Sequence, residues 1–162
     1  MKKFFCALLS FVLMFSFFAF DTFAVSEAET APHVIDFTLS SANDFSVVSN
    51  ETRVSGLILS YGISISKSGT SVVIKGKTAC ASDVVKCGFK NLTVERRKSS
   101  SYSWSDYYDY GDVYRDASAA TLNTTLSVAS GYQYRVTCKH YAKKNLLLTE
   151  NISNVSNIIT VS

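Results

Sequence analysis

The sequence predicts an all-β protein, an antiparallel β-sandwich of about seven strands preceded by a signal peptide and a loosely ordered N-terminal segment. Three observations predict this fold class. The chain is rich in Ser, Thr, Val, Ile and Tyr, a composition typical of sheet proteins. Nothing after the N-terminal apolar run has the period of a helix, and the single proline lies at position 32. Turn residues recur roughly every 8 to 12 positions, the spacing of short strands in a sandwich.

The N-terminus has the pattern of a secretory signal peptide. Lys2 and Lys3 precede an apolar run over residues 4–20, and residues 22–24 provide a small-residue cleavage site that ends at Ala24. We therefore expect residues 1–24 to be removed and the protein to be secreted. The alternative is a membrane anchor formed by an uncleaved 4–20 segment, since this run is at the lower edge of the length of a spanning helix.

The remaining chain divides into a segment without a pattern and a patterned domain. Residues 25–56 mix polar residues with isolated apolar ones, which predicts a linker or loosely attached segment before a sandwich domain over residues 57–162. Alternation begins near Leu57, stops at residues 68–69 and resumes over residues 72–78, which predicts a hairpin.

Two further features of the alternation are informative. Apolar residues change parity between Phe89 and Leu92, so we expect a β-bulge near Lys90 and Asn91. The clearest two-strand unit covers residues 121–144, and it predicts a second hairpin around Gly131. In this unit Arg135, Thr137 and Lys139 alternate with the apolar set and are expected to face water. Strands over residues 146–152 and 158–161 complete the prediction.

Tyr134, which follows the Gly131 turn, resembles the tyrosine corner of immunoglobulin-like and fibronectin type III sandwiches. The larger pattern SYGISIS…SGTSVVIKGKTAC…SGYQYRVTCKHYAKK, over about residues 60–144, resembles a family of small secreted proteins of Gram-positive bacteria known only as a domain of unknown function. The resemblance implies a signal peptide and a β-sandwich-like domain, and it implies no activity and no site residues.

Three cysteines follow the expected cleavage site: Cys80, Cys87 and Cys138. Their odd number leaves one thiol without a partner. Cys80 and Cys138 both lie on the inward parity of a strand, so a disulfide between two facing sheets is one prediction, and a Cys80–Cys87 pair across a short turn is the other. No CxxC motif and no neighbouring histidine completes a metal-ligand set, so we expect no metal.

The candidate ligand-binding residues lie within the stretch 102–116, where aromatic rings alternate with carboxylates. They are Tyr102, Trp104, Asp106, Tyr107, Tyr108, Asp109 and Tyr110. Rigid rings next to hydrogen-bond acceptors suit sugars or peptides. The alternative is an edge hairpin whose rings pack on their own sheet while the aspartates keep the edge soluble.

Catalytic patterns are absent from the sequence. His33 and His140 accompany no GxSxG, HExxH or phosphate-binding glycine loop, so we expect no enzyme and no cofactor. The net charge of +3 predicts neither a nucleic acid nor an acidic membrane as partner, and membrane contact is expected only through an uncleaved signal. The basic turn formed by His140 with Lys139, Lys143 and Lys144 is either solvated or a contact for anionic wall polymers.

The sequence therefore predicts a secreted, non-enzymatic binding module that acts at or outside the cell surface. Its expected partner is a cell-wall polymer, a glycan, a peptide or a surface protein. One alternative is a structural or envelope-assembly protein without a small ligand. The other is a secreted hydrolase that uses aspartate carboxylates, as in the paired carboxylates of glycosidases.

Overall fold

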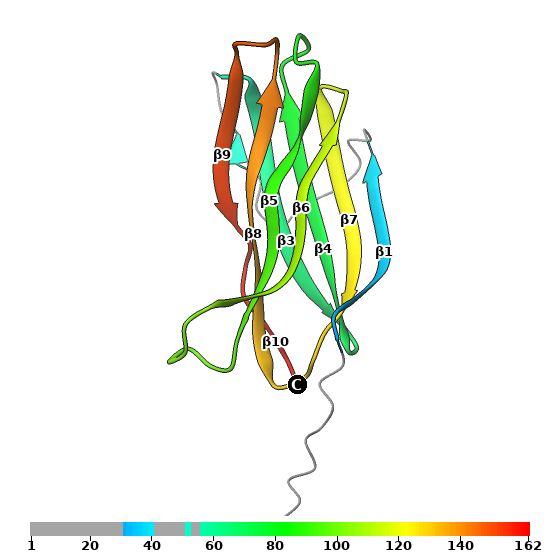
Figure 1. Cartoon of the computed structure of the whole chain (residues 1–162), viewed down its shortest axis with the longest axis vertical. Coiled ribbons are helices and arrows are strands. Elements are labelled where there is room, and N and C mark those ends of the chain that lie inside the picture. Colours follow the sequence, from blue (N-terminus) through cyan, green and yellow to red (C-terminus); the bar gives the residue numbers. More distant parts are fainter. Residues whose placement is uncertain (1–30, 41–50, 53–55) are drawn as a thin grey trace, which may run out of the picture.

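The computed structural model describes residues 31–40, 51–52 and 56–162, and within these ranges every regular element is a strand (Figure 1). The strands are β1 (His33–Ser40), β2 (Glu51–Thr52), β3 (Ile58–Ser68), β4 (Ser71–Cys80), β5 (Lys86–Arg97), β6 (Ser105–Arg115), β7 (Ala119–Ser127), β8 (Tyr132–Lys143), β9 (Thr149–Val155) and β10 (Ile159–Val161). All pairings are antiparallel, so the predicted all-β class is confirmed.

The strands form two sheets that face each other. The first sheet has the order β1-β7-β4-β3-β2, and the second has the order β10-β8-β5-β6 with β9 also paired to β8. β9 and β10 pair with successive parts of β8, so they act as one interrupted edge strand. At the interruption, the Ser156 backbone N–H donates to Val136 O (2.9 Å), and the Ser156 hydroxyl accepts from the Val136 N–H (2.8 Å). The predicted seven strands thus correspond to β3 through β8 and this interrupted strand.

The connectivity is that of immunoglobulin-like and fibronectin type III sandwiches. Of the seven strands, the first, second and fifth (β3, β4, β7) lie in one sheet, and the other four lie in the second sheet. The tyrosine corner is present as well: the Tyr134 hydroxyl donates to the Ala129 carbonyl at 2.7 Å. β1 and β2 are additions at the two edges of the first sheet.

Two predictions from alternation are confirmed. β3 and β4 pair as a hairpin, from Ser68 opposite Ser71 at the turn to Ile58 opposite Cys80. Gly69 in the turn has a φ of +60°, a conformation that glycine adopts without strain. The register of β5 shifts between Phe89 and Leu92, and Asn91 in this bulge has a φ of +47°. The Asn91 N–H is held by the Asp112 carboxylate of β6 at 3.0 Å.

The predicted hairpin over residues 121–144 is wrong. β7 pairs with β1 and β4 in the first sheet, whereas β8 pairs with β5, β9 and β10 in the second, so the Gly131 turn carries the chain across the sandwich. Alternation identified the inward residues of both strands correctly, because Leu122, Leu126, Tyr134 and Val136 are all fully buried. Alternation does not show whether the strand after a turn stays in the same sheet.

The segment 25–56, predicted as a linker or loosely attached, differs from the structure at β1. This strand pairs along its length with β7, from His33 opposite Ser127 to Ser40 opposite Thr121. No period is visible in its sequence because most of its side chains are exposed and its register shifts between Val34 and Asp36. The signal peptide and the uncleaved anchor fall on residues outside the described ranges. Within those ranges no helix is long and apolar enough to cross a membrane.

The core lies between β3, β4 and β7 on one side and β5 and β8 on the other. Its largest fully buried side chains are Tyr134, Phe89, Ile58, Ile63, Ile65, Ile74, Leu92 and Leu122. The two sheets approach closely at Gly76, where an added Cβ would lie 2.8 Å from the Phe89 ring and 2.9 Å from Ile63. Only a residue without a side chain fits here, and this close packing fixes how the second sheet sits on the first.

Candidate functional site

The structure divides the candidate ligand-binding residues between the interior and the surface. Tyr107, Tyr108 and Tyr110 of β6 are partly buried and pack against the core. The Tyr107 ring contacts the Tyr134 ring edge-on at 5.4 Å, and the Tyr110 hydroxyl is 3.0 Å from the Thr124 hydroxyl of the first sheet. These rings pack at the open side of the sandwich, so only part of each ring is left exposed.

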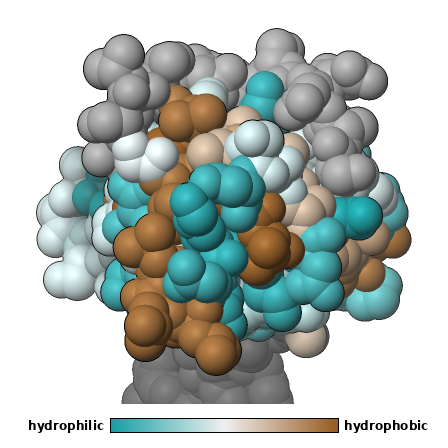
Figure 2. Space-filling model, turned by 90° about the horizontal axis from the view of Figure 1, so that it is seen from above, coloured by the Kyte–Doolittle hydropathy of each residue, from teal (hydrophilic) through white to brown (hydrophobic). Residues whose placement is uncertain are grey.

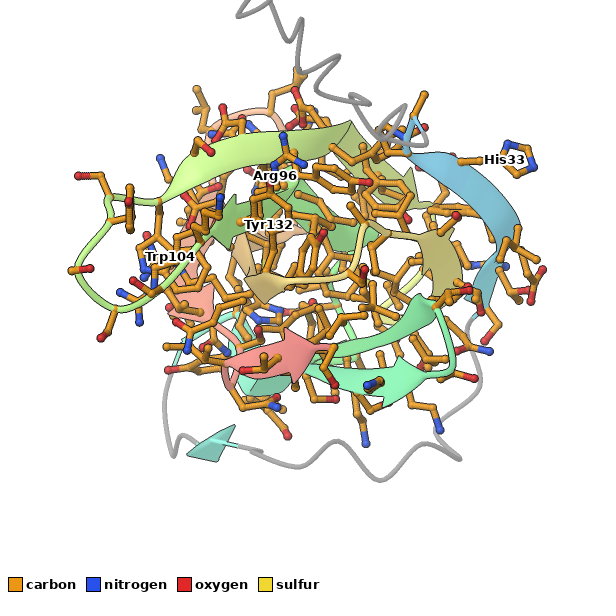
Figure 3. All side chains as sticks on the ribbon, turned by 90° about the horizontal axis from the view of Figure 1, so that it is seen from below. His33, Arg96, Trp104 and Tyr132 are labelled. Atoms are coloured by element: carbon orange, nitrogen blue, oxygen red, sulfur yellow. The ribbon has the colours of Figure 1, made fainter. Side chains whose placement is uncertain are left out.

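An arginine completes this interior tyrosine cluster. The Arg96 guanidinium carbon lies 4.7 Å from the Tyr107 ring centroid and 4.6 Å from that of Tyr132 (Figure 3). Burial raises the pKa of Tyr110 and of Tyr134, so both phenols stay neutral. The cluster is therefore a packing element at the lower end of the sandwich, where cation–π contacts allow a charged group to be covered.

Tyr102 and Trp104 lie on the surface before β6, and Tyr102 is 59% exposed. The Trp104 indole covers two arginines of the outer sheet face, with Arg97 Cζ at 4.4 Å and Arg135 Cζ at 4.3 Å from its ring (Figure 3). Arg135 also donates to the Glu95 carboxylate opposite it at 2.5 Å. Arg135 is consequently half-buried, although the sequence placed it in water.

The two aspartates of the candidate set are exposed on the edge strand β6. The Asp109 carboxylate accepts hydrogen bonds from the Gly111 N–H (2.8 Å) and the Thr93 hydroxyl (3.3 Å). It therefore holds the irregular backbone of β6 in register with β5. Among the described residues, no group of three or more His, Cys, Asp and Glu side chains is placed to hold a metal ion.

The upper half of the second sheet carries a basic surface that the sequence showed only in part. On β5 and β8, four lysines point outward and form two cross-strand pairs, Lys86 opposite Lys143 and Lys90 opposite Lys139. Between these pairs the rings of Tyr114 and Tyr141 meet at 5.0 Å, over a glycine of β5. We name this group the lysine–tyrosine patch; its members are Lys86, Lys90, Lys139, Lys143, Tyr114 and Tyr141.

Contacts inside the lysine–tyrosine patch fix the rings more than the lysines. Lys90 Nζ lies 4.8 Å from the Tyr141 ring centroid, and the Tyr114 hydroxyl donates to the Asp112 carboxylate at 2.5 Å. This hydrogen bond lowers the pKa of Asp112. Lys86 forms an ion pair with Asp116 at 3.3 Å. The other three lysines of the patch have no ion pair within 4.0 Å among the residues that the structure describes.

The turn between β8 and β9 presents a second unusual surface, which the sequence missed. Leu146, Leu147 and Leu148 are 89%, 96% and 47% exposed. The sequence predicted a strand from residue 146, but β9 begins at Thr149, and the three leucines form the turn itself. We name Leu146, Leu147 and Leu148 the leucine turn. A run of three leucines directly after a predicted Lys-Lys-Asn turn was the signal that could have revealed it.

All three described cysteines are free thiols, so the predicted Cys80–Cys138 disulfide is not formed in the structure. The side chains of Cys80 and Cys87 interact instead, which raises the pKa of Cys80 and lowers that of Cys87. Cys138 lies deeper, 3.8 Å from His140, and burial raises its pKa to about 12. The closest thiols are therefore those of the alternative pair across the β4–β5 connection.

The two histidines have different surroundings. His33 projects from β1 and is exposed (Figure 3). His140 is fully buried between the rings of Tyr61 (5.0 Å) and Phe89 (5.3 Å), and this burial lowers its pKa to about 3. The Thr78 hydroxyl donates its only hydrogen to the Gly88 carbonyl at 3.1 Å and lies 2.8 Å from His140 Nδ1. Nδ1 therefore carries the proton and donates it to the Thr78 oxygen. His140 is therefore a neutral member of the core.

Comparison with protein-family models, with curated proteins and with solved structures gives no match. Function is therefore inferred from the two surfaces that the fold leaves open, the lysine–tyrosine patch and the leucine turn.

Proposed function

We propose that this chain is a secreted, non-enzymatic binding module that acts at or outside the cell surface and holds an anionic surface polymer on its lysine–tyrosine patch. One observation carries the proposal: lysines stand directly opposite lysines at two positions of the same strand pair. The resemblance to small secreted proteins supports the location.

The lysine pairs are unfavourable for folding alone. Like charges directly opposite each other in an antiparallel pair destabilise it by about 0.2 to 1 kcal/mol, whereas opposite charges stabilise it by a similar amount. The lower half of the same strand pair follows the favourable rule, with Glu95 opposite Arg135. In the upper half of the strand pair, like charges are opposite each other at two positions, Lys86 with Lys143 and Lys90 with Lys139. An anion bound between the lysines would turn this repulsion into attraction, which gives the arrangement a functional reason.

The spacing of the four lysines suits an extended ligand. Lys86 and Lys90 are four residues apart on β5, and so are Lys139 and Lys143 on β8, which separates the two pairs by about 13 Å along the strands. A small anion would reach one pair only. A polymer with repeated phosphate or carboxylate groups reaches both pairs, and its neutral units would lie on the Tyr114 ring, which packs against the buried Tyr141 ring.

The proposal moves the contact surface away from residues 102–110. Three of the tyrosines there are partly buried against the core, and Tyr102 and Trp104 lie in the connection that follows the other end of β5 from Lys86. Figure 1 shows this β5–β6 connection at the lower end of the sandwich. The acidic edge strand β6 borders the patch and would repel an anionic polymer there. A bound chain is consequently directed along β5 and β8.

Binding to poly(glycerol phosphate) tests the proposal, with neutral dextran as the reference polymer. Lys90→Gln/Lys139→Gln should weaken binding about tenfold, since two surface charge contacts of about 0.5 to 1 kcal/mol each are lost. Raising the salt concentration should weaken wild-type binding as well. Circular dichroism should show the same fold for both proteins.

Lys75→Gln/Lys77→Gln is the matched control, because it removes the same charge from β4 of the first sheet. Its binding should stay within about twofold of wild type. An equal loss in both variants would mean that only net charge matters, and absence of wild-type binding would overturn the anionic-polymer proposal.

A further inference from the structure

The leucine turn lies at one end of the long axis of the sandwich, where β8 passes into β9 (Figure 1). Seen from this end, hydrophobic residues lie beside hydrophilic ones (Figure 2). Leu146 and Leu147 are almost entirely exposed, and Val85 of the neighbouring connection is 56% exposed. The Val85 N–H donates to the Lys143 carbonyl at 2.9 Å, so the two connections are joined. The apolar residues therefore form the tip of the molecule.

Leu146 and Leu147 bury almost no surface on folding. Two-strand connections normally consist of Gly, Asn, Asp and Ser, which suit tight turns and water. Here the turn-forming role belongs to Asn145 alone, whose side-chain oxygen accepts from the Leu147 N–H (3.0 Å) and the Leu148 N–H (2.9 Å). The leucine side chains stay in water, where their apolar surface is unfavourable.

Several backbone groups of the leucine turn already have hydrogen-bond partners within the turn. Besides the two bonds to Asn145, the Lys144 N–H donates to the Leu148 carbonyl at 3.0 Å. Backbone groups that already have partners do not need water, and unsatisfied backbone groups are the main obstacle to placing a non-helical segment among lipid chains. The turn can leave water with these bonds intact.

Cationic groups lie directly below the tip. Lys143 and Lys144 end β8 and begin the turn, and Lys86 stands opposite Lys143. Lys144 also bridges to Asp83 of the neighbouring connection, which lowers the pKa of Asp83 and steadies the tip. Long lysine side chains at this depth reach the phosphates of a lipid surface while their stems stay near the apolar boundary.

We infer that the leucine turn inserts Leu146 and Leu147 into the outer leaflet of a phospholipid bilayer, with Lys143 and Lys86 on the lipid phosphates. A protein partner fits less well. A stable protein interface buries about 800 Å² on each side, whereas the leucine turn offers a few hundred Å². A lipid surface fits better, because the apolar residues of the leucine turn would meet the acyl chains and the lysines next to it would meet the phosphates. This inference shares the extracellular location with the proposed function but does not depend on polymer binding.

A tryptophan at the tip reports insertion directly. In a Trp104→Phe background, Leu147→Trp should shift its emission to the blue on mixing with vesicles of phosphatidylcholine and phosphatidylglycerol. Lipids with brominated acyl chains should quench it. Val155→Trp in the same background is the control, because Val155 is 49% exposed but lies at the far end of β9. Its emission should not change.

The protein for this test is the form that a host produces from the full-length chain, and its mass shows whether residues 1–24 are present. If they remain, the whole chain associates with vesicles through them, yet the emission of the Leu147→Trp variant still reports whether the tip enters the lipid. An unchanged emission at position 147 overturns the inference in either form and redirects the search to a protein pocket.

Cosedimentation with the same vesicles gives the affinity if residues 1–24 are absent. Leu146→Ser/Leu147→Ser should lower the partition coefficient at least tenfold, while Val155→Ser/Ile158→Ser, which also removes two exposed apolar side chains, should leave it within twofold. Equal losses would overturn the inference. Lys90→Gln/Lys139→Gln should bind vesicles nearly as wild type does, so failure of polymer binding and failure of lipid insertion are distinguishable.

Discussion

The tyrosine corner allows a quantitative test of how the crossover from β7 to β8 is held. Tyr134 is fully buried, and its hydroxyl donates to the Ala129 carbonyl at 2.7 Å. Tyr134→Phe keeps the ring and removes this bond, so the cost is the net value of one hydrogen bond plus part of the penalty for the carbonyl left behind. Because Ala129 is only partly buried, water can replace some of the loss. We expect a decrease of about 1.5 kcal/mol in the free energy of unfolding.

Tyr107→Phe provides the matched comparison. The ring of Tyr107 contacts the Tyr134 ring, but the Tyr107 hydroxyl is buried and has no hydrogen-bond partner among the described residues. Removing a buried hydroxyl without a partner is expected to leave stability unchanged or raise it by about 1 kcal/mol. The two substitutions delete the same atom from neighbouring rings, and only Tyr134→Phe should lower the free energy of unfolding.

Urea unfolding followed by circular dichroism measures both effects. With a slope of about 2 kcal/mol per molar urea, Tyr134→Phe should lower the midpoint by about 0.7 M. Tyr107→Phe should not lower it. If Tyr134→Phe left the midpoint unchanged, or if both variants lost equal stability, the corner would not hold the crossover and the reasoning would be refuted.

Three further outcomes follow from the core. Burial lowers the pKa of His140 to about 3, whereas a histidine in the unfolded chain has a pKa of about 6.5. Between these two pH values the unfolded chain therefore binds more protons than the folded protein. The free energy of unfolding should consequently fall by about 2 kcal/mol from pH 7 to pH 5. His140→Gln should remove most of this dependence in urea titrations. Oxidation by a small-molecule disulfide should join Cys80 to Cys87, whose side chains interact, and leave the more deeply buried Cys138 reduced in peptide mapping. Gly76→Ala should destabilise by about 1 to 3 kcal/mol in urea, because its methyl group would overlap the opposite sheet.

Each of these outcomes has a contrary result. His33→Gln, at an exposed position, should keep the pH dependence, and a loss of the dependence there would contradict its assignment to His140. A Cys80–Cys138 disulfide in the folded protein would contradict the observed thiol arrangement. Wild-type stability for Gly76→Ala would show that the two sheets can separate locally without penalty.

Alternation along the chain predicted which side chains are inside, and the structure agrees for residues such as Leu122, Tyr134 and Val136. It also predicted the bulge at Asn91, because a bulge changes the parity of the apolar residues. These successes share one cause: burial of alternate side chains is a local property of a strand, and it leaves a trace in the sequence.

Partner choice between strands leaves no such trace. The crossover at Gly131 has the same parity pattern as a hairpin, and β1 is an exposed edge strand whose pairing partner is far away in the sequence. The same limit applies to the lysine–tyrosine patch: Lys90 and Lys139 are in register only because β5 and β8 pair. Tyr107 and Tyr108 are adjacent, yet both are half-buried because β6 is irregular beside β5.

The leucine turn and the chain terminus of the sandwich lie at opposite ends. β8 runs from Tyr132, next to the C-terminal strand β10, to Lys143 below the leucines (Figure 1). Twelve residues of strand span about 40 Å. With the leucine turn in a lipid leaflet, the strands of the domain would lie along the membrane normal. Residue 162 would then be at the end of the domain farthest from the membrane. The patch lysines would then face sideways within reach of polymers that rise from the same membrane.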